Sequence, residues 1–358
     1  MVAEKKNFKH DDIETLRSRV IVGRDRVTST AGTDYPHNYP GVDLAFDMDT
    51  FKEKFQIKIN SITKTDMEFD MIGVDAALAN AFRRILIAEV PTMAISNVFV
   101  MNNTGVVVDE VLAHRLGLVP ILADPTMFDF KTKEDTPTDL NTIVFKLFAK
   151  CTHNPNAKHG ETDPAKLYNN SSVYSGDLVW DPKGEQAERF KDCPIKPVYD
   201  DIVLTKLRPG QEVDLEVHCE KGLGQDHAKW SPVATASYRL LPEIVVDGEI
   251  TGEDAVKFQG CFPEGVVDVV EENGVKKAVV VNPRKDTVSR EVLRHPEFED
   301  RVKLRRVRDH FIFTIESVGS IAPQDLFVQA VQVLFDKCQQ VRDVLEATAE
   351  PYGDVQMS

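Results

Sequence analysis

The chain has 358 residues, of which 42% are hydrophobic and 28% charged, a composition typical of a globular protein with one large or two medium domains. Its formal net charge of −15 repels phosphate backbones, so autonomous nucleic-acid binding would require a concentrated basic face. The charged first twenty residues contain no apolar signal core, and no run of about eighteen apolar residues occurs. We therefore expect neither secretion nor a membrane span.

The cysteines are scattered and odd in number: Cys151, Cys193, Cys219, Cys261 and Cys338. They form no CxxC pair and no short ligand spacing, so the sequence predicts neither a disulfide framework nor a zinc or iron–sulfur site. We expect no cofactor.

Residues 1–50 are polar and contain glycine and proline, which predicts an extended arm that orders against a partner. From Phe51 the sequence FKEKFQIKINSI alternates apolar and polar residues, and MEFDMIGV forms a second alternating run. This pattern predicts a hairpin that buries one face, with Phe55, Ile57 and Ile59 on it.

A helix is predicted at residues 75–89, because apolar residues recur there at helical spacing and Pro91 follows. Strands are predicted at 94–101 and 106–108, joined by a turn at 102–105. The acidic pair Asp109 and Glu110 opens a second predicted helix at 109–116, which Gly117 and Pro120 close.

The region from 122 to 306 is rich in short strands and polar loops, which predicts a mostly β domain. Strands are expected at 141–151, 213–219, 237–246 and 278–281. The segment from Arg284 reads as a loop entering a helix, with Thr287 or Ser289 as the N-cap. Another strand is predicted from Asp309, and the longest helix opens at Pro323 with apolar residues at three- and four-residue steps.

No complete catalytic constellation occurs in the sequence. His114 has no nucleophile or carboxylate pair nearby, and Asp226 with His227 supplies too few metal ligands. The Gly222–Gly224 region does not complete a phosphate-loop pattern. Two alternatives to a binding protein stay open at this point: a hydrolase that uses these residues, and a nucleic-acid module that uses the basic run RVKLRRVR at 301–308.

Several longer strings resemble one family, the alpha-type assembly subunits of cellular RNA polymerases. They are NAFRRIL at 80–86, EVP at 89–91, DEVLAHRLGLVP at 109–120 and HAKWSP at 227–232. The strings RKDTVSREVLR at 284–294, KLRPGQ at 206–211 and DCP at 192–194 resemble the branch of larger alpha-like subunits shared by polymerases I and III. The resemblance extends from about residue 20 to 340.

The resemblance implies an α+β fold with a dimerisation domain built from two chain segments. These would be residues 51–121 and 307–347, with an inserted, mostly β domain at 122–306, an N-terminal arm at 1–50 and a tail at 348–358. The family's first and last helices join the corresponding pair of a smaller alpha-like subunit. The implied dimer interface comprises Leu78, Phe82, Ile85, Leu86, Leu326, Ala330, Val333, Leu334 and Val341.

A second implied interface faces the second-largest catalytic subunit and comprises Arg83, Arg84, His227, Lys229 and Trp230. Small zinc-binding subunits are further expected partners, and the chain itself is expected to hold no metal. The resemblance thus implies a non-catalytic scaffold for the transcription of rRNA, 5S rRNA and tRNA, located in the nucleus and nucleolus.

Overall fold

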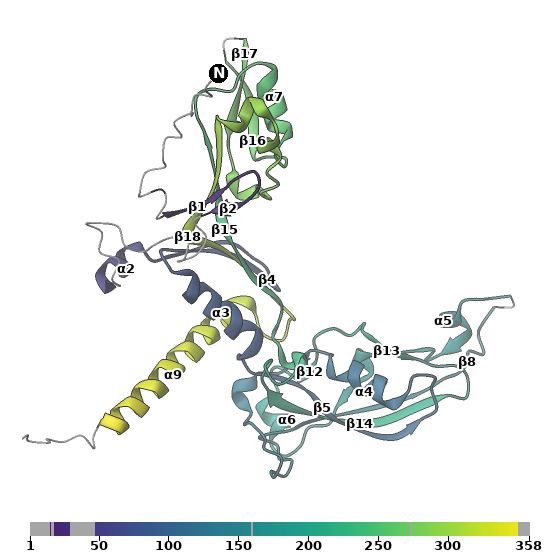
Figure 1. Ribbon diagram of the computed structural model, residues 1–358. Coiled ribbons are helices and arrows are strands. Elements are labelled where there is room, and N and C mark those ends of the chain that lie inside the picture. The colour runs from purple at the N-terminus through teal and green to yellow at the C-terminus, as the bar shows by residue number, and fades with distance from the viewer. Residues whose placement is uncertain (1–14, 16–17, 29–46, 159, 273, 350–358) are drawn as a thin grey trace, which may run out of the picture. The chain divides into compact units, whose positions relative to one another are not determined.

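The structure is a computed structural model that describes residues 15, 18–28, 47–158, 160–272 and 274–349. The chain divides into two compact units, each assembled from segments that lie far apart in the sequence (Figure 1). Unit 1 contains the described residues within Met1–Asn60, Glu68–Asn80 and Ser237–Phe313, and unit 2 contains those within Ser61–Met67, Ala81–Ala236 and Thr314–Ser358. Helices and strands are mixed in both units, so the predicted α+β class is confirmed.

Unit 1 is organised by a six-stranded sheet of order β2-β1-β18-β4-β3, in which β15 also pairs with β18. The strands are β1 (Arg19–Val22), β2 (Val27–Thr28), β3 (Gln56–Ile62), β4 (Asp66–Ile72), β15 (Val233–Val246) and β18 (Val302–Ser317). Strand β1 runs antiparallel to β18, with Arg19 opposite Val307. This part of the predicted N-terminal arm therefore pairs within its own chain, contrary to the prediction. Residues 1–14, 16–17 and 29–46 of that arm lie outside the described residues.

Aromatic side chains fill the core of unit 1. Phe69 stacks on Phe313 with ring centroids 5.3 Å apart, and Tyr238 meets Phe311 edge-on at 5.2 Å. A second cluster centres on Phe258. The surrounding elements are α7 (Glu253–Gly260), β16 (Val267–Glu272), β17 (Val275–Val280), η4 (Pro283–Lys285), η5 (Glu291–Arg294) and α8 (Pro296–Glu299).

The helix predicted after Arg284 is only the short 3₁₀ turn η5. Its N-cap residue Arg290 has left-handed backbone geometry and makes no side-chain cap, while the Ser289 hydroxyl accepts a long 3.4 Å bond from the Glu291 N–H. Neither predicted capping residue therefore starts a full helix.

A buried carboxylate, Asp70, ties four segments of unit 1 together. The Arg284 guanidinium donates to both Asp70 oxygens at 2.6 and 2.9 Å and to Glu68 at 2.7 Å. His310 Nε2 lies 3.0 Å from Asp70 Oδ2, and the Asn60 amide donates to Oδ1 at 2.9 Å. Because Asp70 is only 6% exposed, it depends on these partners to compensate for lost hydration.

The hairpin predicted from Phe51 begins later, since residues 48–54 form helix α2 (Met48–Lys54). The Asp47 carboxylate accepts the Thr50 N–H at 2.8 Å, and a side-chain cap of this kind starts a helix despite the alternating pattern. Strand β3 is exposed along its whole length, so the predicted burial of Phe55, Ile57 and Ile59 is wrong for the single chain. The buried apolar residues of the hairpin lie on β4.

Unit 2 contains a four-stranded sheet of order β11-β7-β14-β5. Its strands are β5 (Thr92–Asn103), β7 (Ile143–Lys150), β11 (Val179–Trp180) and β14 (Glu212–Gly222), which overlap the predicted strands at 94–101, 141–151 and 213–219. Helix α4 (Asp109–Gly117) buries Leu112 and Leu116 in the same core as Phe145 and Val217. Three strand pairs are added: β6 (Ile121–Leu122) with β12 (Lys196–Pro197), β8 (Thr152–His153) with β9 (Tyr168–Asn169), and β10 (Ser172–Tyr174) with β13 (Val203–Lys206).

The strand predicted at 106–108 is wrong, because these residues form a bent loop. The Asn103 amide donates to the Val107 carbonyl at 3.0 Å and to the Asp109 carboxylate, and its oxygen accepts the Gly105 N–H. These local bonds replace a strand ladder. The short helical turns of unit 2 are η1 (Pro125–Met127), α5 (Pro164–Leu167), η2 (Ser175–Asp177), α6 (Gln186–Arg189) and η3 (Ala228–Trp230).

The two longest helices are α3 (Ala76–Ala88) and α9 (Pro323–Ala349), which confirms both predictions. Neither they nor any other described helix is long and apolar enough to cross a membrane. The predicted domain bounds stay a prediction.

Candidate subunit interface

The second half of α3 packs on the first turns of α9 within unit 2. The rings of Phe82 and Phe327 lie 5.5 Å apart, and Glu89 forms an ion pair with Lys337. Four residues of the predicted dimer interface are buried in the chain itself, at 3% exposure or less: Ile85, Leu86, Leu326 and Ala330. These side chains therefore hold α3 and α9 in place and present little surface to a partner.

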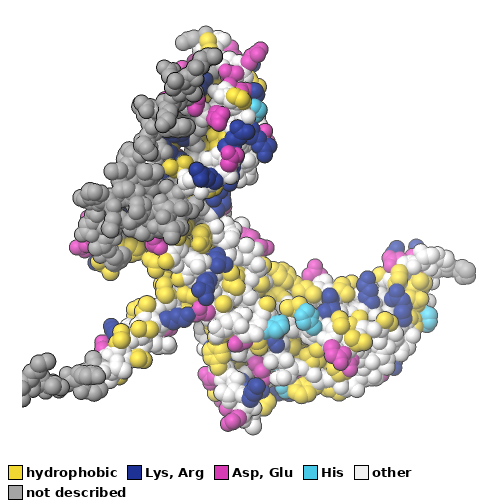
Figure 2. Space-filling model, viewed as in Figure 1, with side chains coloured by type: hydrophobic (Ala, Val, Ile, Leu, Met, Phe, Trp, Pro, Cys, Tyr) yellow, Lys and Arg dark blue, Asp and Glu magenta, His cyan; other side chains and the backbone are white. Residues whose placement is uncertain are grey.

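The remaining predicted dimer residues are accessible to different degrees. Leu78 is 37% and Val341 61% exposed, while Phe82, Val333 and Leu334 are half-buried. Exposed residues recur along α9 at steps of three or four, a set we call the α9 stripe: Val328, Val331, Phe335, Cys338, Val341 and Leu345. Figure 2 shows apolar side chains gathered along α9.

An amphipathic helix of this length is stable only when its apolar stripe is covered. The α9 stripe includes Phe335 at 55% and Leu345 at 62% exposure, so the described part of the chain leaves it uncovered. The arrangement is suited to burying a second helical surface. The sequence pattern identified this helix. It did not distinguish the apolar residues that are buried within the chain from those that are exposed.

The arginine pair on α3 divides between two environments. Arg83 is half-buried, whereas Arg84 is exposed and makes no ion pair with another described residue. Arg84 is therefore available for bidentate recognition of a carboxylate on another chain, the geometry for which a guanidinium is suited.

Hydrogen bonds made by Trp230 hold the HAKWSP loop in place. Trp230 Nε1 donates to the Glu220 carbonyl at 3.0 Å, the Trp230 carbonyl accepts the Thr92 hydroxyl at 2.7 Å, and His227 Nδ1 accepts the Lys229 N–H. The Lys229 ammonium lies 4.2 Å from the indole centroid. Trp230 is thus half-buried and positions an exposed His227 beside a half-buried Lys229.

Burial lowers the pKa of Lys229, and the Glu220 carboxylate opposes that shift. A partly desolvated ammonium on an aromatic ring is typical of a preformed contact point, because both side chains are already ordered. The loop therefore offers a rigid cation and an aromatic edge.

Glycine lets the same loop approach α3 closely. The Gln225 N–H donates to the Ala88 carbonyl at 2.9 Å, and a Cβ placed on Gly224 would lie 2.2 Å from the Ile87 carbonyl oxygen. Only a residue without a side chain fits this contact.

We expect Gly224→Ala to lower the free energy of unfolding by about 1–3 kcal/mol, because backbone must move to relieve the overlap. Thermal unfolding of the purified chain measures the effect. Gly260→Ala is the matched control: apart from its chain neighbours and its own helix backbone, no described atom lies within 4 Å of a Cβ at Gly260. Equal melting temperatures for the two variants would contradict the close packing of loop and helix.

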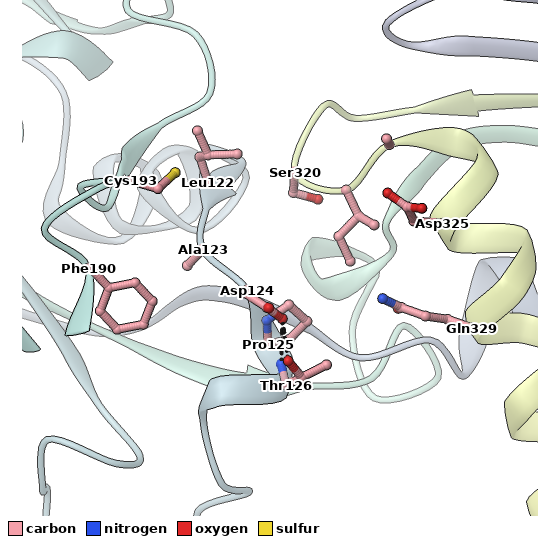
Figure 3. Close-up of a pocket in the computed structure, with 12 residues that line it drawn as sticks. Leu122, Ala123, Asp124, Pro125, Thr126, Phe190, Cys193, Ser320, Asp325 and Gln329 are labelled. Carbon is pink, nitrogen blue, oxygen red and sulfur yellow. Dashed lines mark hydrogen bonds between the residues drawn. The ribbon is translucent and has the colours of Figure 1, made fainter.

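A cavity of about 380 Å³ lies beside the first turns of α9, opposite the 122–126 loop. Gln329 reaches from α9 toward this loop (Figure 3). The Asp124 carboxylate accepts the N–H and the hydroxyl of Thr126, so it serves the turn η1. Among the described residues that line the cavity, none is a histidine, and the nucleophile candidates are Cys193, Ser320 and Thr126. This lining therefore lacks the histidine that a serine–histidine or cysteine–histidine hydrolase would need.

The other residues considered for chemistry have structural surroundings. His114 lies in the last turn of α4, and buried Cys219 has a thiol whose pKa is raised by burial. Within the described ranges, no group of three or more His, Cys, Asp or Glu side chains could hold a metal ion.

Residues 302–308 of the basic run belong to β18, which begins seven residues before the predicted strand start. Successive side chains of a strand point to opposite faces, so Lys303 and Arg305 lie on one face and Arg306 and Arg308 on the other. Val302 and Leu304 are buried in the core. The run consequently does not form the single basic face that a nucleic-acid module would need.

The profile of the family described as the RNA polymerase Rpb3/Rpb11 dimerisation domain matches residues 68–338. The mouse DNA-directed RNA polymerases I and III subunit RPAC1 is 49% identical over 94% of this chain and 97% of its own length. The Saccharomyces cerevisiae subunit of that name is 50% identical, over 90% and 98%. The Dictyostelium discoideum DNA-directed RNA polymerase II subunit rpb3 is 30% identical, over 80% and 93%.

The matched region contains α3, α4 and the HAKWSP loop, and it reaches into the α9 stripe as far as Cys338. The family resemblance read from the sequence is confirmed. The chain belongs to the RNA polymerase Rpb3/Rpb11 dimerisation-domain family.

Proposed function

We propose that the chain is a non-catalytic assembly subunit of RNA polymerases I and III. The observation that carries the proposal is the exposed α9 stripe in a chain that belongs to a family of dimerisation domains. The names of the relatives at about half identity support the choice of polymerases. These polymerases would transcribe rRNA, 5S rRNA and tRNA, and the chain would be located in the nucleus, including the nucleolus.

The first partner in this proposal is the smaller alpha-like subunit. Helices α3 and α9 would meet the corresponding helices of that subunit, and the α9 stripe together with Leu78 would be buried between them. Each large apolar side chain that becomes buried contributes roughly 1.5–3 kcal/mol, so several of them make the heterodimer obligate. Residues such as Leu86 and Ala330 would act indirectly, by holding α3 against α9.

The second proposed contact anchors the second-largest catalytic subunit. Arg84 would pair with a carboxylate, while Lys229 and Trp230 would form the centre of the contact, with His227 and Arg83 beside them. The order already present in the HAKWSP loop supports this role, because a preformed surface loses little entropy on binding. Small zinc-binding subunits would complete the scaffold, and the chain would need neither cofactor nor membrane.

A tagged pull-down from native extract at moderate salt, followed by mass spectrometry, tests the proposal. We expect the smaller alpha-like protein together with the large subunits of two polymerases, because the α9 stripe requires a partner. Recovery of the large subunits of one polymerase would overturn the shared role. A lone monodisperse monomer would overturn the assembly role.

A further inference from the structure

A groove in unit 2 lies between the start of α4 and β13, and it has a volume of about 480 Å³. Figure 1 shows these two elements next to each other. The groove's lining is largely aliphatic: Val106 is 80% and Val111 50% exposed, while Leu204 is buried at its base. A row of valines this exposed is unusual on a surface that meets only water.

All charged side chains among the described residues that line this groove are positive. Arg115 donates through Nε to the Leu204 carbonyl at 3.1 Å, Arg208 lies over the Tyr168 ring, and Lys206 is exposed on β13. Among the described residues, none of these three forms an ion pair with a carboxylate, and no acidic residue lines the groove. Three positive charges remain without a described counter-charge in a chain of net charge −15.

We infer that this groove binds an acidic, apolar peptide segment of a partner protein. Aliphatic side chains of the segment would cover Val106 and Val111, and its carboxylates would face Lys206, Arg208 and Arg115. Charge complementarity favours an acidic occupant and excludes a basic one. A nucleic-acid strand fits less well, because the described lining offers aliphatic side chains and no exposed aromatic ring on which bases could stack.

The test uses the full chain and a fluorescein-labelled synthetic peptide of alternating aspartate and leucine, with anisotropy as the readout. We expect saturable binding that weakens as salt is raised. The double variant Val106→Asp/Lys206→Glu should bind at least about tenfold more weakly, because both changes place negative charge in the groove. Both residues are exposed, so the fold should remain intact.

The matched control is Val179→Asp/Lys191→Glu, which makes the same charge change at exposed positions of unit 2 outside the groove. Equal weakening by both double variants would overturn the proposal, since the effect would then follow net charge. Tighter binding of a labelled oligouridylate than of the peptide would also overturn it, in favour of a phosphate ligand. The assay does not require the polymerase partners, so its failure is distinct from failure of the pull-down.

Discussion

Replacement of Arg284 by methionine should destabilise unit 1 by about 3–5 kcal/mol, because it leaves the buried Asp70 carboxylate without the guanidinium that donates to both of its oxygens. The remaining bonds from His310 and Asn60 cannot replace a guanidinium charge. Amide hydrogen exchange measured by mass spectrometry locates the effect. We expect peptides from β4 and β18 to exchange at least about a hundredfold faster, since each 1.4 kcal/mol corresponds to a factor of about ten.

Arg294→Met is the matched control for this experiment. The Arg294 side chain is 69% exposed and pairs with Glu291 at the surface, so its loss should change stability by under about 1 kcal/mol. The double variant Asp70→Asn/Arg284→Met should recover part of the lost stability, because it removes the uncompensated charge. Equal exchange in Arg284→Met and Arg294→Met would refute a stabilising role for the cluster.

The same cluster should make unit 1 sensitive to acid. Burial alone would raise the pKa of Asp70, but hydrogen bonds from His310 and Arg284, together with the Arg284 charge, hold the pKa below its ordinary value. A carboxyl whose pKa is lower in the folded chain than in the unfolded chain stabilises the fold fully above about pH 5. That contribution is lost as pH falls through about 4 toward the depressed folded pKa, and Arg284→Met should reduce this dependence. Thermal unfolding of both chains across this pH range measures the difference.

The double variant Phe335→Asp/Leu345→Asp should abolish recovery of the proposed partner, the smaller alpha-like subunit. Both side chains are exposed in the single chain, so their replacement acts on the partner contact and not on the packing of α9 against α3. In the proposed heterodimer both side chains would be buried, so their loss would remove about 3–6 kcal/mol, before the added cost of burying two carboxylates. Phe82→Asp would be less selective, because the Phe82 ring also packs on Phe327.

Gln340→Asp/Ala347→Asp provides the control on the same helix. At about 100° per residue these exposed positions point away from the α9 stripe, so the variant adds the same charge on the opposite face. Quantitative mass spectrometry of the tagged chain's partners compares the two. Normal recovery of the partner with Phe335→Asp/Leu345→Asp would rule out the α9 stripe as the dimer surface.

The elements predicted correctly are those in which a regular apolar pattern extends over many consecutive residues. Helix α9 repeats its apolar residues over many turns, and β7 and β14 alternate clearly enough to be found from their own sequences. The errors lie where a short polar interaction decides the backbone. The Asp47 cap starts α2 inside an alternating run, and the Asn103 bonds replace a strand with a loop.

The sequence could predict which residues belong to the candidate site. It could not predict which of their side chains are exposed and which are buried within the chain. Whether Leu326 faces a partner or its own chain depends on α3, which lies more than two hundred residues earlier, and a sequence period does not record that pairing. The basic groove was missed for the same reason. Arg115 and Lys206 appear unrelated in the sequence, and they meet only because α4 lies against β13.

The pairing of β1 with β18 also sets an order of events during synthesis. Arg19 is synthesised 288 residues before Val307, its partner in the strand ladder. At roughly 5–20 residues per second, β1 waits for tens of seconds before its neighbour exists. Helix α9 follows β18 in the sequence, so a growing chain would expose the α9 stripe only after β18 has been made. A chain whose synthesis has not yet reached α9 therefore lacks the α9 stripe.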